Sequence, residues 1–240
     1  MKRSSQTTCW LFVMGLIAVT MLHALLLCLP VVICMPWHGL VPHAAVVLFL
    51  LLISVWCLIE SVQSSNNMRF PMQSYGPSCL PYLVGMSLLN AFWVSLADIF
   101  VFAITPSNVL IIVGSLLMAV GILLRYLSLR TLGEFFLNEI TMLPGQPLVT
   151  HGIYGAVRHP SETGILCLAI GGAVMLGSIC GFLIVALLLS PILVWRVKLE
   201  DRMLRSHYPC EFEHYQKLVP AFFPSLRFIS RCLYDTRVIR

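Results

Sequence analysis

Charged residues are scarce in this chain. Only 10% of its 240 residues are charged, whereas 59% are hydrophobic, and the mean hydropathy is +0.91. A water-soluble globule needs more polar surface than this composition provides. The sequence therefore excludes an ordinary soluble domain and predicts that most of the protein is surrounded by lipid.

Long segments contain no charged residue at all. These charge-free runs extend from Trp10 to Ile59, Pro71 to Ala97, Ile99 to Leu124 and Thr163 to Trp195. Each run can hold at least one membrane crossing, because about 20 apolar residues span a bilayer. The first run is too long for the apolar part of a secretory signal, so we interpret it as a retained helix.

Proline, glycine and polar residues divide these runs into six predicted transmembrane helices. They cover residues 10–34, 41–60, 80–104, 109–129, 163–176 and 179–195. The last two are short and are joined by only Gly177 and Ser178, which indicates a tight hairpin, re-entrant or transmembrane. The predicted fold class is an all-α integral membrane protein with a C-terminal helical hairpin.

Lysine and arginine are absent from alternate loops. If the N-terminus faces the cytoplasm, the opposite loops, around residues 36–40, 105–108 and 177–178, carry none. The positive-inside rule then places Arg125 to Glu162 and Arg196 to Arg240 together on the cytoplasmic face. We expect the polar chemistry there, and we divide the chain into N-terminal transmembrane helices over 1–124 and a catalytic region over 125–240.

Several familiar chemical arrangements are also missing. The nine cysteines include no C-x-x-C pair and His23 has no ligand partner at metal spacing, so we predict no metal site. No Ser-His-Asp set is evident. The net charge of +5 comes without an aromatic platform or a compact basic module, which excludes nucleic acid as a partner. We interpret the positive charge as orientation bias and attraction to anionic membrane lipid.

One segment between the fourth and fifth predicted helices carries a distinctive pattern. It reads L-V-x-x-G-x-Y-x-x-x-R-H-P-x-x-x-G from Leu148 to Gly164. Pro160, followed by Ser161 and Glu162, is typical of a helix start, where free backbone amides favour an anionic group. Tyr154 suits packing against an adenine. A lone Arg-His pair in this place would simply reach toward lipid headgroups.

Three other features have simpler explanations beside functional ones. Arg196 and Glu200 are four residues apart and share a helix face, so they are either site residues or an ion pair within the helix. Asp98, inside the third predicted helix, is more readily explained as a locally bonded carboxylate than as part of an ion pathway. Residues 200–215 predict an amphipathic helix that lies on the membrane and roofs the site.

The pattern from Leu148 to Gly164 resembles the signature of the isoprenylcysteine carboxyl methyltransferase family. The likeness extends to Trp195-Arg196, Glu200-Asp201, Tyr215 and the prolines at 220 and 224, which is a little under half of the chain. The first four predicted helices show no specific resemblance. Glu162 departs from the family, which commonly has tyrosine in that place; the acid there would attract a sulfonium or pair with Arg158.

The resemblance implies methylation of the C-terminal carboxylate of a prenylated cysteine in CaaX-processed proteins. It implies S-adenosyl-L-methionine as cofactor, farnesyl- or geranylgeranyl-cysteine termini as partners and the endoplasmic reticulum as location. Arg196 takes the catalytic, substrate-binding position. The implied cofactor-binding positions are Gln146, Pro147, Leu148, Val149, Tyr154, His159, Pro160, Ser161, Glu162 and Glu200.

Three alternatives stay open. A methyltransferase acting on a phospholipid amine or another small lipid would share the cofactor segment, but an amine has no use for Arg196. An NADPH-dependent enzyme resembling sterol reductases would need further Arg or Lys side chains, besides Arg158, to bind the phosphates of NADPH. A membrane scaffold or transporter is supported only by the number of predicted helices.

Overall fold

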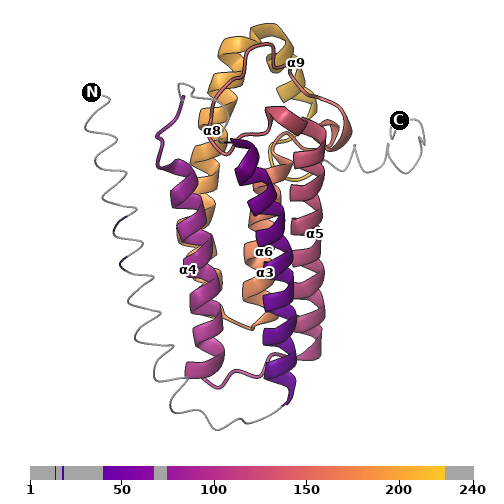
Figure 1. The fold of residues 1–240 in the computed structure, drawn as a ribbon. Helices are drawn as coiled ribbons and strands as arrows, with labels where there is room; N and C mark the ends of the chain where they lie inside the picture. The colour runs from indigo at the N-terminus through magenta and orange to yellow at the C-terminus, as the bar shows by residue number, and fades with distance from the viewer. Residues whose placement is uncertain (1–13, 15–17, 19–39, 68–74, 225–240) are drawn as a thin grey trace, which may run out of the picture.

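The computed structural model describes residues 14, 18, 40–67 and 75–224, and within these every regular element is helical (Figure 1). The elements, in chain order, are α3 (Leu40–Asn67), α4 (Leu80–Val101), α5 (Asn108–Leu132), a 3-10 turn η2 (Gly133–Phe135), a 3-10 turn η3 (Gly152–Gly155), α6 (Pro160–Met175), α7 (Ile179–Ile184), a π turn η4 (Val185–Leu189), α8 (Ser190–His207) and α9 (Pro209–Leu218). The predicted helix at residues 10–34 lies almost entirely outside the described residues.

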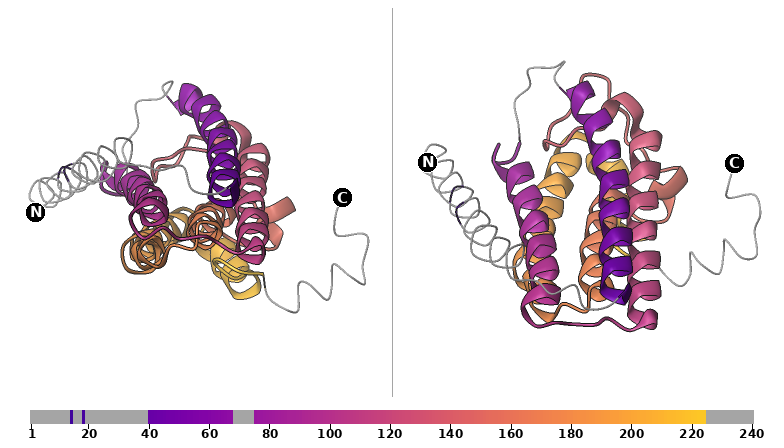
Figure 2. Two further views of the ribbon diagram at one scale, coloured as in Figure 1. Left: turned by 90° about the horizontal axis from the view of Figure 1, so that it is seen from below. Right: turned by 60° about the horizontal axis from the view of Figure 1, so that its bottom comes forward.

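The long helices run side by side along one axis, and the connection from α5 to α6 gathers with α9 at one end of the bundle (Figures 1 and 2). Three helices are long and apolar enough to cross a membrane: Leu80–Ile99, Asn108–Phe135 and Ile179–His207. Two shorter apolar helices cover Ala44–Glu60 and Pro160–Met175. The all-helical prediction is confirmed for the described residues, and the three long helices fit a membrane protein.

Glycines allow α5 and α6 to pack backbone against backbone. A Cβ atom added at Gly121 would lie 2.6 Å from the Gly164 carbonyl oxygen, and one added at Gly171 would lie 2.7 Å from the Met118 amide nitrogen. Small residues at helix contacts permit this close approach in membranes, where van der Waals packing and not water exclusion joins helices. This contact fixes the start of α6, and with it the residues of the Leu148–Gly164 pattern.

The predicted final crossing at 179–195 lies within a longer helical stretch that extends from Ile179 to His207. Pro191 has no amide hydrogen to donate and lies in the first turn of α8, directly after the π turn η4, and the Ser190 hydroxyl donates to the Val185 carbonyl at 2.8 Å. The predicted single helix over 200–215 is wrong. It is divided between α8 and α9 at Tyr208, which leaves the helical region because Pro209 follows it.

Asp98 lies at the opposite end of the bundle from α9 and is bonded locally, as predicted. Its Oδ2 accepts a hydrogen bond from the Ser178 hydroxyl at 2.6 Å and another from the Cys180 amide at 3.3 Å. The Ser178 Oγ in turn accepts from the Gly181 amide at 2.8 Å. The acid therefore caps the start of α7, where backbone amides lack partners inside the helix.

Candidate active site

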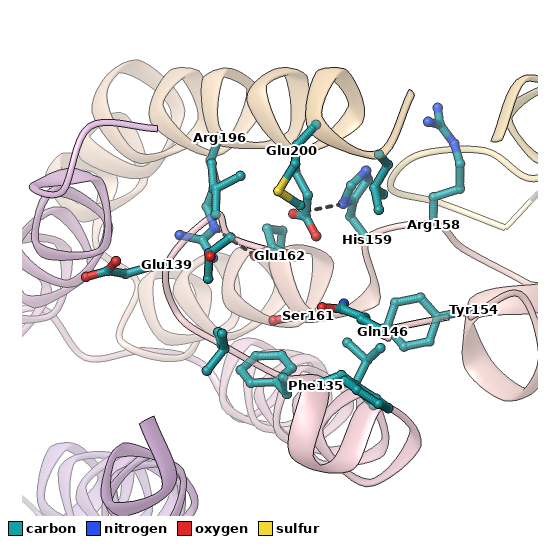
Figure 3. A pocket seen from close by; sticks show the side chains of 17 residues that line it. Phe135, Glu139, Gln146, Tyr154, Arg158, His159, Ser161, Glu162, Arg196 and Glu200 are labelled. Atoms are coloured by element: carbon teal, nitrogen blue, oxygen red, sulfur yellow. Dashed lines mark hydrogen bonds and ion pairs between the residues drawn. The ribbon is translucent and has the colours of Figure 1, made fainter. Parts of the chain in front are cut away.

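A hollow of about 560 Å³, partly open to solvent, lies where the α5–α6 connection, the start of α6 and the outer part of α8 meet (Figure 3). Seven of the predicted site residues line it: Gln146, Tyr154, His159, Ser161, Glu162, Arg196 and Glu200. These residues are separated by up to 54 positions in the sequence (146 to 200). Tertiary structure brings the two charged segments together in one cavity.

The other four predicted residues stand just outside the cavity lining. Leu148 packs against a small cluster formed by Phe212, Tyr215 and Val219. Pro160 is fully buried as the first residue of α6. Pro147 is exposed and follows the lining residue Gln146, and Val149 is half-buried. These four predicted residues are therefore not part of the cavity lining.

Arg196 and Glu162 form a buried ion pair across the cavity. The Arg196 Nε donates to Glu162 Oε1 at 3.0 Å, with side-chain exposures of 9% and 6% (Figure 3). A buried charge is tolerated only when it is paired and hydrogen-bonded. The acid that departs from the family pattern is thus the partner of the predicted substrate-binding arginine, and not, as one reading of the sequence had it, of Arg158.

A second cluster links α6 to α8 through His159, which is 2% exposed. One ring nitrogen, Nε2, lies 2.8 Å from Asp201 Oδ1, and the other, Nδ1, lies 3.4 Å from Glu200 Oε2. Burial lowers the pKa of His159, but the two neighbouring carboxylates outweigh burial and raise it to about 10. The imidazole is therefore protonated at neutral pH and donates to both acids.

Arg158 points to the far side of this cluster. Its Nη1 donates to Asp201 Oδ2 at 2.7 Å and its Nε to the Val219 carbonyl at 2.9 Å. Arg196 and Glu200 do not pair with each other along the helix, because each has a partner on α6 or just before it. The reading of these two residues as an ion pair within one helix is wrong.

The segment around α9 closes the cavity from outside. The Tyr215 hydroxyl donates to the Tyr154 carbonyl at 2.6 Å, and the Tyr208 hydroxyl donates to the Gln146 carbonyl. Desolvation by burial raises the pKa of Tyr154 well above its ordinary value, with Glu162 and Glu200 adding to it, so the phenol stays neutral. The prediction that this part of the chain covers the site fits these contacts, with α9 and the end of α8 taking the place of one long helix.

Comparison with known proteins finds a similarity over this part of the chain. Residues 109–211 match the phospholipid methyltransferase family. The predicted family resemblance is confirmed. A probable protein-S-isoprenylcysteine O-methyltransferase of Oryza sativa is 31% identical over 114 residues, which are 47% of this chain and 60% of the rice protein.

Two further relatives also match part of the chain. The protein-S-isoprenylcysteine O-methyltransferase of Schizosaccharomyces pombe is 38% identical over 77 residues, 32% of this chain and 33% of the relative. A cobalt-zinc-cadmium resistance protein of Cupriavidus metallidurans is 34% identical over 115 residues, 48% of this chain and 52% of the relative. The chain therefore spans less than two thirds of the length of each of these relatives.

The candidate site also contains a group of possible metal ligands. One ligand atom each of His159, Glu162 and Glu200 lies within 4.8 Å of the others. A divalent cation there would have to displace the His159 proton and compete with Arg196 for Glu162. A positively charged organic group can instead share the carboxylates without removing a proton. The absence of a metal remains a prediction.

One wall of the cavity and the residues that hold it were not predicted from the sequence. Seven residues between positions 132 and 141 line this side: Leu132, Phe135, Phe136, Leu137, Glu139, Ile140 and Thr141. Glu60 and Arg125, which hold that wall, were also not selected. A signal was present, because each is the first charge after a charge-free run, and both runs end on the same predicted face.

Proposed function

We propose that this protein is a membrane-embedded, S-adenosyl-L-methionine-dependent methyltransferase that acts on the C-terminal carboxylate of a prenylated cysteine in CaaX-processed proteins. The observation that carries the proposal is the meeting of Arg196 and Glu200 from α8 with His159 and Glu162 in one cavity. The names of the rice and fission yeast relatives support the same acceptor.

The charges of the cavity favour a cationic cofactor. Three cations (Arg158, His159, Arg196) are paired with three carboxylates (Glu162, Glu200, Asp201), and the exposed Glu139 also lines the cavity. S-adenosyl-L-methionine, which carries one net positive charge, suits this excess of one carboxylate. The phosphates of NADPH would meet cations that are already paired.

Glu200, Gln146, Ser161 and Tyr154 are suited to hold the cofactor. Glu200 is a carboxylate whose His159 contact, at 3.4 Å, is long enough to be shared with a cationic group. Tyr154 offers a buried ring with a neutral phenol for an adenine. The cofactor, when bound, supplies an activated methyl group on sulfur. The protein's task is then to orient the two reactants and exclude water from them.

Arg196 is suited to hold the acceptor. Its Nε is occupied by Glu162, whereas its two terminal nitrogens make no hydrogen bond to any of the described residues. A guanidinium with this free edge can bind a carboxylate by two parallel hydrogen bonds. Since a carboxylate is ionised at neutral pH, its attack on the methyl group needs no general base. The methyl group moves from sulfur to oxygen and the sulfonium becomes a neutral thioether.

The proposed topology has six transmembrane helices and a cytoplasmic N-terminus, with the cavity facing the cytoplasm of the endoplasmic reticulum. It is supported by the meeting of the cavity lining with the Glu60–Arg125 ion pair near the end of α3 and the outer part of α5. Residues 1–124 would provide the apolar walls through which a prenyl chain enters from the bilayer. Residues 125–240 would form the catalytic region, and the substrate would be a lipid-anchored protein terminus.

Methyl transfer by the purified protein in detergent tests the proposal. Labelled S-adenosyl-L-methionine should methylate farnesyl-cysteine, and phosphatidylethanolamine should remain unlabelled. Binding of S-adenosyl-L-methionine but not NADPH should accompany this result. Transfer to the phospholipid alone would replace the acceptor assignment, and binding of NADPH alone would overturn the cofactor assignment.

A further inference from the structure

Arg125 is a buried arginine in the outer part of α5, and it lies next to the cofactor cavity without lining it. The residue is 4% exposed. Its guanidinium is held by Glu60 of α3 through two hydrogen bonds, from Nε to Oε1 at 2.7 Å and from Nη2 to Oε2 at 2.9 Å. Two parallel bonds of this kind fix both the position and the plane of the guanidinium.

The same guanidinium contacts two parts of the cavity. Its Nη1 donates to the hydroxyl of Ser161, the second residue of α6, and its Nη2 donates to Asn138 Oδ1 at 3.2 Å. It also lies over the ring of Phe136, 4.8 Å from the ring centre. Ser161 and Phe136 both line the cavity. One side chain therefore connects the start of α6 to the wall formed by residues 132–141.

Glu60 lies outside the segment that matches the methyltransferase family, residues 109–211. Arg125 lies inside that segment but is oriented by Glu60. Trp56, one turn before Glu60 on α3, also packs against the guanidinium at 5.7 Å. Helix α3 thus supplies both the neutralising charge and a packing surface for a residue that organises the site.

We propose that Glu60 and Arg125 form a positioning pair through which helix α3 sets the affinity of the cavity for its methyl donor. This inference rests on the proposed function, because it assigns a donor to the cavity. Arg125 holds Ser161 and the 132–141 wall in place, and Glu60 keeps Arg125 from turning away. A small displacement of binding groups is sufficient to weaken a site that works by orientation.

Removing the charge of Glu60 tests the pair. Glu60→Gln should raise the dissociation constant for S-adenosyl-L-methionine about tenfold or more, with a smaller change in turnover at saturating donor. Asn138→Ala removes the contact to the wall and leaves the ion pair intact, so it should weaken donor binding without burying an unpaired charge. Glu213→Gln, in the exposed pair with Lys217 on α9, is the matched control and should change neither value.

A double variant separates positioning from general stability. Glu60→Gln combined with Arg125→Gln leaves no buried unpaired charge, so it remains informative if the single variant folds poorly. If the pair acts as one unit, the double variant should bind the donor no more weakly than Glu60→Gln alone. Hydrogen exchange should also rise in residues 133–141 of Glu60→Gln and not in α9.

The outcomes distinguish this inference from the proposed function. A wild-type protein that fails to bind S-adenosyl-L-methionine contradicts the proposed function. A wild-type protein that binds and transfers the methyl group, with unchanged donor affinity in Glu60→Gln and Asn138→Ala, overturns the positioning pair alone. A fall in melting temperature with unchanged donor affinity per folded molecule would assign the pair a structural role and also overturn it.

Discussion

The two ends of the helix bundle each bury a carboxylate at the start of a helix, but the partners differ. At one end Asp98 is bonded to a hydroxyl and a backbone amide, which are neutral and fixed in place. At the other end Glu162 and Glu200 face Arg196 and His159 beside a cavity. Burial of an acid therefore does not identify a site; charged partners and adjacent space do.

The largest expected effect on turnover is at Arg196, the proposed acceptor-binding residue. Arg196→Ala should lower turnover of farnesyl-cysteine about 10²- to 10³-fold, the usual loss when one charge-stabilising donor is removed. Cofactor binding should be largely kept, as measured by calorimetry on the detergent-solubilised protein. Arg196→Lys keeps a charge next to Glu162 and controls for folding. Unchanged turnover in both variants would remove Arg196 from the acceptor site.

Substitution of Glu200 should weaken binding of the methyl donor and leave binding of the acceptor unchanged. Glu200→Gln removes a charged hydrogen-bond acceptor worth about 2 kcal/mol, so the dissociation constant for S-adenosyl-L-methionine should rise about 30-fold. The Michaelis constant for farnesyl-cysteine should change little. The reverse pattern, with acceptor binding weakened and donor binding intact, would exchange the roles of Glu200 and Arg196.

The Glu162→Gln variant tests the role of the acid that stands where the resembled family commonly has tyrosine. In Glu162→Gln, Arg196 keeps a hydrogen-bond partner but is no longer neutralised. The Michaelis constant for the acceptor carboxylate should fall about tenfold, because a hydrogen bond to a charged group is worth about 1.5 kcal/mol or more and Glu162 would no longer compete for the buried guanidinium with its charge. Steady-state kinetics at saturating cofactor measure this constant. An increase would show that Glu162 assists acceptor binding and does not compete with it.

His159 should make stability depend on pH in the alkaline range. Its pKa is raised to about 10 in the folded protein, above an unfolded value of about 6.5. The stabilisation is therefore fully present below about pH 6.5 and is lost as the pH rises toward 10, by at most ~1.4 kcal/mol per pH unit. Thermal melting of wild-type protein should show this decline, and melting of His159→Gln should not.

The smallest effect on activity is expected at the opposite end of the bundle. Asp98→Ala leaves the Ser178 hydroxyl and the Cys180 amide without their shared acceptor, which should reduce the free energy of unfolding by about 1–3 kcal/mol. Turnover per folded molecule should stay at the wild-type value. A loss of methyl transfer without a loss of stability would show that the two ends of the bundle are functionally connected.

Much of the fold follows from hydropathy along the chain. The predicted helices at 41–60, 80–104 and 109–129 correspond to α3, α4 and α5, because unbroken apolar runs have few stable alternatives to a helix in lipid. The error lies at the C-terminal side. Pro209 divides the predicted helix at 200–215 into α8 and α9. This division depends on local backbone conformation, which hydropathy does not record.

The members of the candidate site were largely predicted from the sequence, but their pairings were not. Gln146, Tyr154, His159, Ser161, Glu162, Arg196 and Glu200 share the cavity, since pattern and charge marked them in the sequence. The partner of Glu162 was not predicted correctly, because one residue on α6 can face several helices. Glu60 and Arg125 were missed because 65 positions separate them.

The sequence by itself determined that this protein is helical and apolar, that most of its charged residues fall in two segments, and that one segment carries a pattern similar to a methyltransferase family signature. Composition and local spacing are sufficient for these properties. Only the tertiary structure decided which charges are paired: Arg196 with Glu162, His159 with Glu200 and Asp201, and Arg125 with Glu60. A buried ion needs its partner within a few ångströms, and that distance is set by the packing of helices far apart in sequence.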